Sequence, residues 1–404
     1  DLSSNLLESL PTVLSGLSQL NLMKLTSNQF TGPMPAAIGS LTSLATLYAS
    51  YNQFTGPIPS SIGLLTGLTD LDLRVNNFTA IPPSITLLTN LYALDLTFNQ
   101  LNTPIPKELG SMVGLTKLDL SANQIPDTIP STLGKLTQLN YLSLAYNQLS
   151  GTIPSSIGSL TGLTYLGLVV NKLSGSIPPS FSLLSSLDSL DLRYNQLSSS
   201  ITKEIGFMTA LTSIDLSNNL IPGSIPSTLG ALKQLFILLI TDNLLSGTIP
   251  AALSTLSQVA YIKLANNKLT GSIPAGIGSL TNLASLDLKR NQLSGAIPAS
   301  FSSLTGLGEL GLSFNNFSGA IPSAISLLGN LYGLDLSYNQ LSGPIPDWIG
   351  SMTSLNRLVF MNNQLSGDIP AALGALINMD FLDLSNNQLS RLPSALGTLS
   401  VMSV

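Results

Sequence analysis

Two residue types are missing from this sequence of 404 residues, because it contains neither cysteine nor histidine. Without cysteine the chain has no disulfide bonds. Without both it has no Ser-His-Asp or Cys-His nucleophile system and none of the common zinc sites. We therefore expect no metal and no cofactor, and we expect that the chain is not an enzyme.

Charged residues are scarce. They make up 9% of the sequence, against about 25% in a typical soluble domain. The 15 basic and 20 acidic residues give a net charge of −5 without any basic tract, which argues against nucleic acid as a partner. A surface built mostly from Ser, Thr, Asn, Gln and Gly gives weak repulsion between copies, so it suits a glycosylated, matrix-embedded or assembled protein.

Long hydrophobic runs are also absent. The longest strongly apolar stretch covers residues 235–240, far short of the roughly 20 residues that a membrane helix needs. We expect no membrane span in this chain.

One residue type recurs with a fixed period. Asparagines follow one another in steps of 24 residues, with a single step of 23, and each closes the frame L-x-x-L-x-L-x-x-N, as in Leu139, Leu142, Leu144 and Asn147. A period of 20 to 29 residues with this leucine spacing is typical of a leucine-rich repeat solenoid. The series consists of Asn28, Asn52, Asn76, Asn99, Asn123, Asn147, Asn171, Asn195, Asn219, Asn243, Asn267, Asn291, Asn315, Asn339, Asn363 and Asn387.

The repeat predicts an α/β solenoid. Residues 165–169 alternate at the two-residue period of a strand, and a return path of about 20 residues makes successive strands parallel. We expect the parallel sheet on the concave face and short helical turns and loops on the convex face. In residues 150–158 we expect Gly151 to form a turn, Pro154 to open a helical turn and Gly158 to close it.

The recurring asparagine has a predicted structural role. At the strand exit the chain bends and leaves buried backbone donors and acceptors that need partners, and an amide side chain offers both kinds. We expect these side chains to form a ladder between neighbouring turns, with no role in binding.

Residues 283–304 and again residues 331–352 follow most of the unit L-x-x-L-x-x-L-x-L-x-x-N-x-L-S-G-x-I-P-x-x-L-G-x-L. It resembles the plant-type leucine-rich repeat of receptor-like kinase ectodomains and polygalacturonase-inhibitor proteins, over essentially the whole chain. The resemblance implies a right-handed superhelix outside the cell or at its surface that binds peptides, proteins or glycans.

The chain departs from that family in its ends. Family members usually carry cysteine-paired caps. Here we expect residues 1–404 to form a single domain of about 17 turns of 23–24 residues, uncapped and mid-repeat at both ends. Uncapped solenoid ends expose a core cross-section. Two explanations stay open: caps that lie outside these residues, or copies that stack end to end into a fibre.

Departures from the repeat average mark the candidate binding surface. We expect a binding patch on the concave face made of Tyr141, Tyr165, Val169, Phe236, Ile237, Leu239, Tyr261 and Lys263. The alternative is that these residues reflect random drift of the repeat sequence, or that some of them pack against one another.

A second group of outward residues is acidic. Asp72, Asp95 and Asp119 follow one another in successive turns, which would raise their proton affinity or attract a cation. Neutralisation by Arg74 and Lys117 is the structural alternative, and we favour it because charge arrays often imitate active sites.

Two glycosylation acceptor sequences begin at Asn77 and Asn316. We expect an extracellular or cell-surface scaffold that binds a protein, peptide or glycan through its concave face. The alternative is a structural protein that joins end to end into a glycosylated extracellular fibre.

Overall fold

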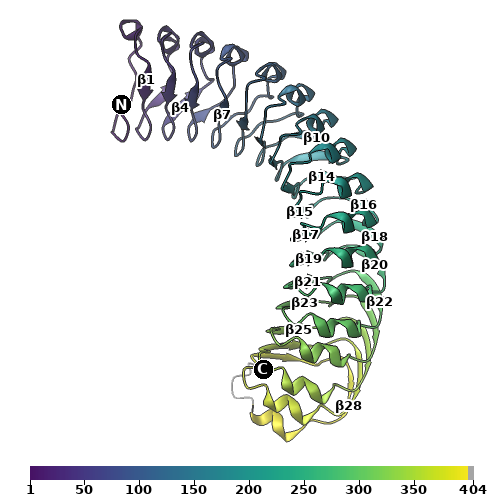
Figure 1. Ribbon diagram of the computed structural model, residues 1–404. Coiled ribbons are helices and arrows are strands. Elements are labelled where there is room, and N and C mark those ends of the chain that lie inside the picture. The colour runs from purple at the N-terminus through teal and green to yellow at the C-terminus, as the bar shows by residue number, and fades with distance from the viewer. Residues whose placement is uncertain (399–404) are drawn as a thin grey trace. The chain divides into compact units, whose positions relative to one another are not determined.

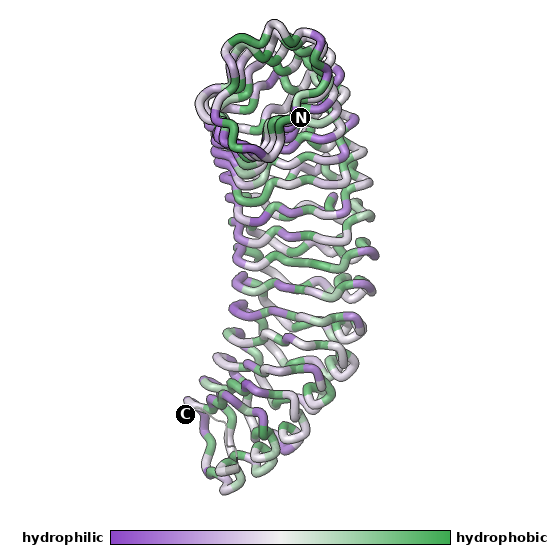
Figure 2. The backbone as a smooth tube through the Cα atoms, turned by 90° about the vertical axis from the view of Figure 1, so that its left-hand side faces the viewer, coloured by the Kyte–Doolittle hydropathy of each residue, from purple (hydrophilic) through white to green (hydrophobic). Residues whose placement is uncertain are grey.

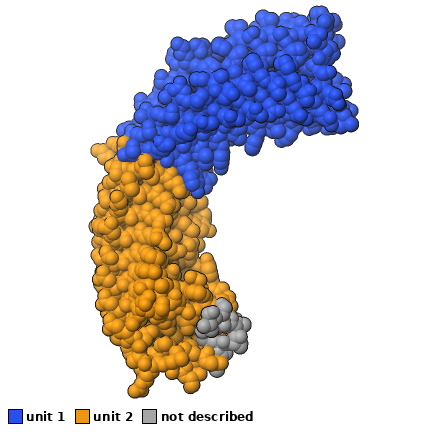
Figure 3. Space-filling view, turned by 180° about the vertical axis from the view of Figure 1, so that it is seen from behind, with its two compact units in different colours: residues 1–198 blue, residues 199–404 orange. Residues whose placement is uncertain are grey.

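The computed structural model describes residues 1–398. The chain divides into two compact units, residues 1–198 and residues from 199 onward (Figure 3). Both units are built from the same repeated turn.

Each turn contributes one short strand to a parallel main sheet. In the first unit the order is the chain order, with one turn between neighbouring strands: β1 (Leu22–Lys24), β3 (Thr46–Tyr48), β5 (Asp70–Asp72), β7 (Ala93–Asp95), β8 (Lys117–Asp119), β9 (Tyr141–Ser143), β11 (Tyr165–Gly167) and β13 (Ser189–Asp191). In the second unit the strands are β15 (Ser213–Asp215), β17 (Ile237–Leu239), β19 (Tyr261–Lys263), β21 (Ser285–Asp287), β23 (Glu309–Gly311), β25 (Gly333–Asp335), β27 (Arg357–Val359) and β29 (Phe381–Asp383).

A 3-10 turn lies on the opposite side of most repeats, so that in each unit the main sheet lines the inner side and the 3-10 turns line the outer side (Figure 1). This arrangement confirms the predicted α/β solenoid. The 3-10 turns of the first unit are η1 (Ser15–Leu17), η2 (Ala36–Ser40), η3 (Ser60–Leu64), η4 (Pro83–Leu87), η5 (Lys107–Ser111), η6 (Ser131–Lys135), η7 (Ser155–Ser159) and η8 (Pro179–Leu183). Those of the second unit are η9 (Lys203–Phe207), η10 (Ser227–Ala231), η11 (Ala251–Thr255), η12 (Ala275–Ser279), η13 (Ala299–Ser303), η14 (Ser323–Leu327), η15 (Asp347–Ser351), η16 (Ala371–Ala375) and η17 (Ser394–Thr398).

Short strands of a second kind follow the asparagine, and the sequence analysis did not predict them. They pair in parallel with the equivalent segment of the next turn, and Gly151 in this segment has φ +70, the conformation expected of a turn glycine. In the first unit they are β2 (Thr31–Pro33), β4 (Gln53–Gly56), β6 (Asn77–Phe78), β10 (Ser150–Thr152), β12 (Lys172–Gly175) and β14 (Gln196–Leu197). In the second they are β16 (Pro222–Gly223), β18 (Leu244–Thr248), β20 (Lys268–Gly271), β22 (Gln292–Gly295), β24 (Asn316–Gly319), β26 (Gln340–Gly343), β28 (Gln364–Gly367) and β30 (Gln388–Leu389).

The glycine of the 3-10 turn has a different role from the one predicted. Pro154 precedes η7 as expected, but η7 ends at Ser159 and its C-cap residue is Leu160, so Gly158 does not close the turn. A Cβ atom at Gly158 would overlap the carbonyl oxygen and Cβ of Ser180 in the next repeat. Glycine is needed here because adjacent turns approach closely.

The interior of each turn is filled by the frame leucines, and hydrophobic and hydrophilic segments recur from turn to turn (Figure 2). Leu139, Leu142 and Leu144 are fully buried. Near the start of the chain, phenylalanines from three successive turns stack, with ring centroids 5.5 Å apart for Phe30 and Phe54 and 6.0 Å apart for Phe54 and Phe78.

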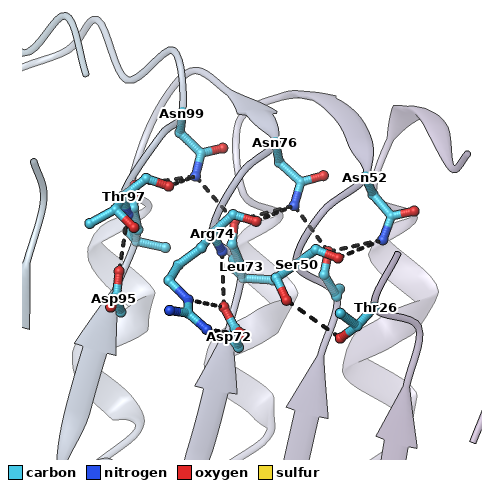
Figure 4. Close-up of polar contacts among 12 residues, drawn as sticks. Thr26, Ser50, Asn52, Asp72, Leu73, Arg74, Asn76, Asp95, Thr97 and Asn99 are labelled. Atoms are coloured by element: carbon cyan, nitrogen blue, oxygen red, sulfur yellow. Dashed lines mark hydrogen bonds and ion pairs between the residues drawn. The ribbon is translucent and has the colours of Figure 1, made fainter. Parts of the chain in front are cut away.

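The asparagine ladder is confirmed (Figure 4). Asn76 Nδ2 donates to the carbonyl oxygens of Ala49 at 3.0 Å, Leu73 at 3.2 Å and Arg74 at 3.2 Å, while its Oδ1 accepts from the backbone N–H of Phe54 at 3.1 Å. Asn52 and Asn99 make the equivalent bonds in the neighbouring turns. Each amide therefore joins its own strand exit to the preceding turn.

Candidate functional site

The outward side chains of the main sheet form rows, because neighbouring strands pair in register. Tyr141 lies opposite Tyr165, and Ser143 lies opposite Gly167. Since outward residues are not required by the core, each turn can present a different side chain on this face. These rows are the candidate functional surface.

In the first unit two predicted residues come together. The rings of Tyr141 and Tyr165 stack with centroids 4.6 Å apart and planes 10° apart, and Tyr165 is 39% exposed. Lys117 Nζ lies 5.3 Å from the Tyr141 ring centroid, a cation–π distance. Burial, together with the nearby negative charge of Asp119, raises the pKa of Tyr141 well above its ordinary value. Its hydroxyl therefore remains a neutral hydrogen-bond donor.

Val169 does not belong to this surface. Its side chain is 5% exposed, and Ala145 at the same position of the preceding turn is 4% exposed. The position lies where the chain bends toward the asparagine, so the side chain is covered by neighbouring turns. Val169 is therefore not part of the candidate patch.

Two of the three carboxylates in the acidic row, Asp72 and Asp95, are paired with the cations that the structural alternative named. Arg74 Nε lies 2.8 Å from Asp72 Oδ1 (Figure 4), and Lys117 Nζ lies 2.7 Å from Asp95 Oδ2. Asp119 Oδ1 accepts hydrogen bonds from Ser121. Within residues 1–398 no group of three or more acidic residues is arranged to hold a metal ion.

The expectation of raised proton affinity is wrong for Asp72. Burial alone would raise the pKa of this carboxyl, but hydrogen bonds from Arg74 and Ser50 outweigh burial and lower it. The two ion pairs line a hollow in the first unit together with Tyr48 and Ala93.

The second unit carries the other predicted patch residues. Phe236, 47% exposed, meets Tyr261 edge to face with ring centroids 5.7 Å apart. Ile237 pairs with Tyr261 across the strands, and Leu239 pairs with Lys263; both aliphatic side chains are half-buried. Lys263 Nζ lies 2.9 Å from Glu309 Oε2, two turns further along.

A hollow in the second unit was missed by the sequence analysis. Gly333 stands at the first, outward position of β25, where a side chain would otherwise fill the surface. At Gly311 of β23, in the preceding turn, that space is taken by the side chains of Asp287 and Lys289. The signal lay in the sequence, where glycine stands at position 333 in place of the charged residues at the equivalent positions 309 and 357. The hollow is lined by Lys289, Gly308, Glu309, Leu310, Tyr332, Gly333, Leu334, Asp335 and Arg357.

Two carboxyl groups near this hollow differ in pKa. For Glu309 burial favours the neutral form, but hydrogen bonds from Ser285 and Lys263 outweigh it and lower the pKa. For Asp287 burial raises the pKa, and the opposing effect of the positive charge of Lys289 is not large enough to reverse this shift. Glu309 is therefore the more firmly ionised of the two.

Two family models match the chain. Both are described as leucine rich repeat; one matches residues 66–125, 233–293, 257–317, 281–341 and 329–389, and the other residues 43–65, 138–160 and 210–232. This chain is a leucine-rich repeat protein. Among curated proteins a sequence search gave no match.

Solved structures show that its repeats are of the plant type. The plant peptide hormone receptor RGFR1, in complex with RGF2, is 33% identical with a TM-score of 0.88, and the match covers 100% of this chain and 73% of that one. The Arabidopsis receptor kinase HAESA ectodomain, in complex with an IDA peptide hormone, is 34% identical with a TM-score of 0.77, covering 99% and 76%. PEPR1 with AtPEP1 is 33% identical with a TM-score of 0.83, covering 98% and 59%.

The two glycosylation acceptors of this leucine-rich repeat chain differ in exposure. Asn316 in β24 is exposed, whereas Asn77 in β6 is half-buried and its Oδ1 accepts a hydrogen bond from Gln100 Nε2 at 2.7 Å. The residue after each asparagine, Phe78 or Phe317, is buried in the core. In the described part of the chain no helix has the length and apolarity to cross a membrane.

Proposed function

We propose that this leucine-rich repeat chain is a ligand-binding scaffold that recognises a peptide, or an extended segment of a protein, across the inner face of its main sheet. The observation that carries the proposal is the contrast within each turn. The inward leucines and the asparagine repeat, while the outward rows hold exposed aromatic residues, paired charges and hollows.

Two features favour a peptide over a rigid, globular surface. Parallel strands are spaced about 4.8 Å apart, and an extended chain advances about 3.3 Å per residue. A peptide that crosses the strands therefore meets a new pair of outward residues about every one and a half residues. The similar receptors RGFR1 and HAESA were solved with peptide hormones bound. A glycan ligand and end-to-end fibre assembly remain predictions from the sequence alone.

The proposed setting is extracellular or at the cell surface. It is supported by the similarity to a receptor ectodomain and by the low share of charged residues. Expression through a secretory pathway should attach a glycan at the exposed Asn316, and peptide mass spectrometry of the wild type and of Asn316→Gln would detect it. A secreted chain that carries no glycan at Asn316 would contradict this part of the proposal.

Selection of binders from a library of random linear peptides tests the binding function. Replacing Tyr141 and Tyr165 by Ser, or Phe236 and Tyr261 by Ser, removes outward aromatic side chains from one unit at a time. If such residues anchor the ligand, each double variant should weaken selected peptides that contact its unit by about 30-fold, the effect of a 2 kcal/mol hot spot.

Matched controls lie on the outer side. Val113 is 57% exposed and Phe207 in η9 is 58% exposed, so their replacement by Ser removes similar apolar surface away from the main sheet. Failure to enrich any peptide, or equal losses in the outer variants, would refute binding across the inner face.

A further inference from the structure

The hollow of the second unit has a defined charge order. Glu309, Gly333 and Arg357 occupy the first position of β23, β25 and β27, and Gly333 is paired with Arg357 in the sheet. Along the solenoid the row therefore runs negative, empty, positive. The two charged residues are two strand spacings apart, about 10 Å.

Local contacts hold both charged side chains away from the empty position. Glu309 Oε2 accepts from Lys263 Nζ at 2.9 Å and from Ser285 Oγ at 2.6 Å. On the other side the Arg357 guanidinium lies 4.3 Å from the ring centroid of Phe381. Among residues 1–398, the ion pairs do not include Arg357, so its charge is available to a ligand.

Two further charged residues line the hollow, Lys289 and Asp335. Lys289 Nζ lies 3.9 Å from Asp287 Oδ2, and Asp335 limits what can enter. Asp335 lies two positions from Gly333 on β25, and its Oδ1 accepts from Ser337 N–H at 3.0 Å and Ser337 Oγ at 2.6 Å. Its charge opposes an acidic group directly above Gly333, while its second carboxylate oxygen faces no ion-pair partner in the described chain. The hollow itself therefore favours a neutral or donor-bearing group.

We infer that this hollow recognises a peptide segment that has a basic and an acidic residue three positions apart. The basic residue lies at Glu309 and the acidic residue lies at Arg357. Which of the two comes first depends on the direction in which the peptide runs. In a polyproline II helix residues i and i+3 lie on the same face, about 9 Å apart, which matches the separation of the two strands. The backbone between them passes over the glycine. This inference rests on the proposed peptide-binding function and specifies its ligand.

Filling the hollow tests the steric half of the inference. A Cβ atom at Gly333 would lie 3.7 Å from Arg357 Cβ and 4.0 Å from Arg357 O, both ordinary contact distances, so Gly333→Leu should fold. Gly306→Leu is the matched control, because its Cβ would lie 3.8 Å from Thr281 O and the position is exposed and outside the hollow. Circular dichroism and thermal unfolding should show both variants folded.

The probes are blocked peptides that share neutral flanks and differ in the centre: Lys-Pro-Pro-Asp, Lys-Ser-Ser-Asp, and the charge-neutral Gln-Pro-Pro-Asn. NMR or fluorescence titration of the full chain should show the Lys/Asp peptides binding about fivefold or more tighter than the neutral one, as expected for partly exposed ion pairs. Gly333→Leu should remove this preference, and Gly306→Leu should keep it.

Two neutral variants assign each charge. In Arg357→Gln, replacing the peptide's Asp by Asn should no longer change the affinity, while replacing its Lys by Gln should still weaken binding. In Glu309→Gln, replacing the peptide's Lys by Gln should no longer change the affinity, while replacing its Asp by Asn should still weaken binding. Equal binding of charged and neutral peptides, or a preference that survives in Gly333→Leu, would overturn the inference. If library peptides nevertheless bind in a way that depends on Tyr141 and Tyr165, the proposed function stands without it.

Discussion

The edge of a turn that carries the ladder asparagine, here called the asparagine edge, and the outward face of its strand differ in the substitutions that they tolerate. At the edge, Asn291 makes the same backbone contacts as Asn76, and any loss leaves buried groups unpaired. On the outward face, Glu309, Gly333 and Arg357 occupy one strand position in three successive turns with three different chemistries. The fold is thus held by the repeated edge and interior, which leaves the outward rows free to specify a ligand.

A charge in the interior should have the largest effect. Leu144 is fully buried, so Leu144→Asp places an unpaired carboxylate among leucines and should destabilise the first unit by about 4 kcal/mol or more. Urea unfolding measures the loss, and hydrogen exchange should show it spreading to the adjacent turns. Thr161→Asp, at an exposed position of a neighbouring turn, should change stability by less than about 0.5 kcal/mol. Similar losses in both variants would contradict the assignment of Leu144 to the interior.

The asparagine edge should rank second. Asn291 Nδ2 donates to the carbonyl oxygens of Leu264, Leu288 and Lys289, and its Oδ1 accepts from the backbone N–H of Leu269. Asn291→Ala leaves these groups without their partner, so a loss of about 3 kcal/mol is expected, the upper end for an unsatisfied buried group. The adjacent Gln292 is exposed, and Gln292→Ala is the control in the same unfolding experiment. A neutral Asn291→Ala would show that the ladder does not stabilise the turn.

Close approach of the 3-10 turns should rank third. A Cβ at Gly158 overlaps the Ser180 backbone, whereas a Cβ at Gly162 would lie 3.7 Å from Leu139 O. Gly158→Ala should therefore cost about 2 kcal/mol through overpacking, and Gly162→Ala should be nearly neutral. Thermal unfolding of the two variants measures both effects, and a Gly158→Ala variant as stable as the wild type would contradict the close approach of the 3-10 turns.

The repeated features could be predicted from the sequence because the same spacing of leucines and asparagine recurs in every turn. The spacing of Leu139, Leu142, Leu144 and Asn147 indicates the strand, the interior and the ladder together, and the pairing of Asp72 with Arg74 follows from two residues on the same face of one strand exit.

The remaining features depend on contacts between turns. The burial of Val169 depends on how the neighbouring turns cover the bend, and the second strands form only when residues such as Ser150 meet the next repeat. The hollow over Gly333 is the absence of a side chain between Glu309 and Arg357, and it becomes visible only when the strands are aligned in register.

The smallest effect should come from an ion pair on the outward face, and it depends on pH. Hydrogen bonds from Arg74 and Ser50 lower the pKa of Asp72 below its ordinary value despite burial, so this carboxylate contributes stability above the ordinary pKa of aspartate, and that contribution is lost as the pH falls through the folded-state pKa. Because the Arg74 side chain is 42% exposed, solvent screening limits the contribution to about 1 kcal/mol or less. Asp72→Asn should flatten the acid side of the stability profile, measured by urea unfolding between about pH 2 and pH 6 around the ordinary carboxyl pKa. A contribution from Asp72 as large as that of Asn291 would mean that the outward rows also hold the fold together, and the division between a structural edge and a recognition face would fail.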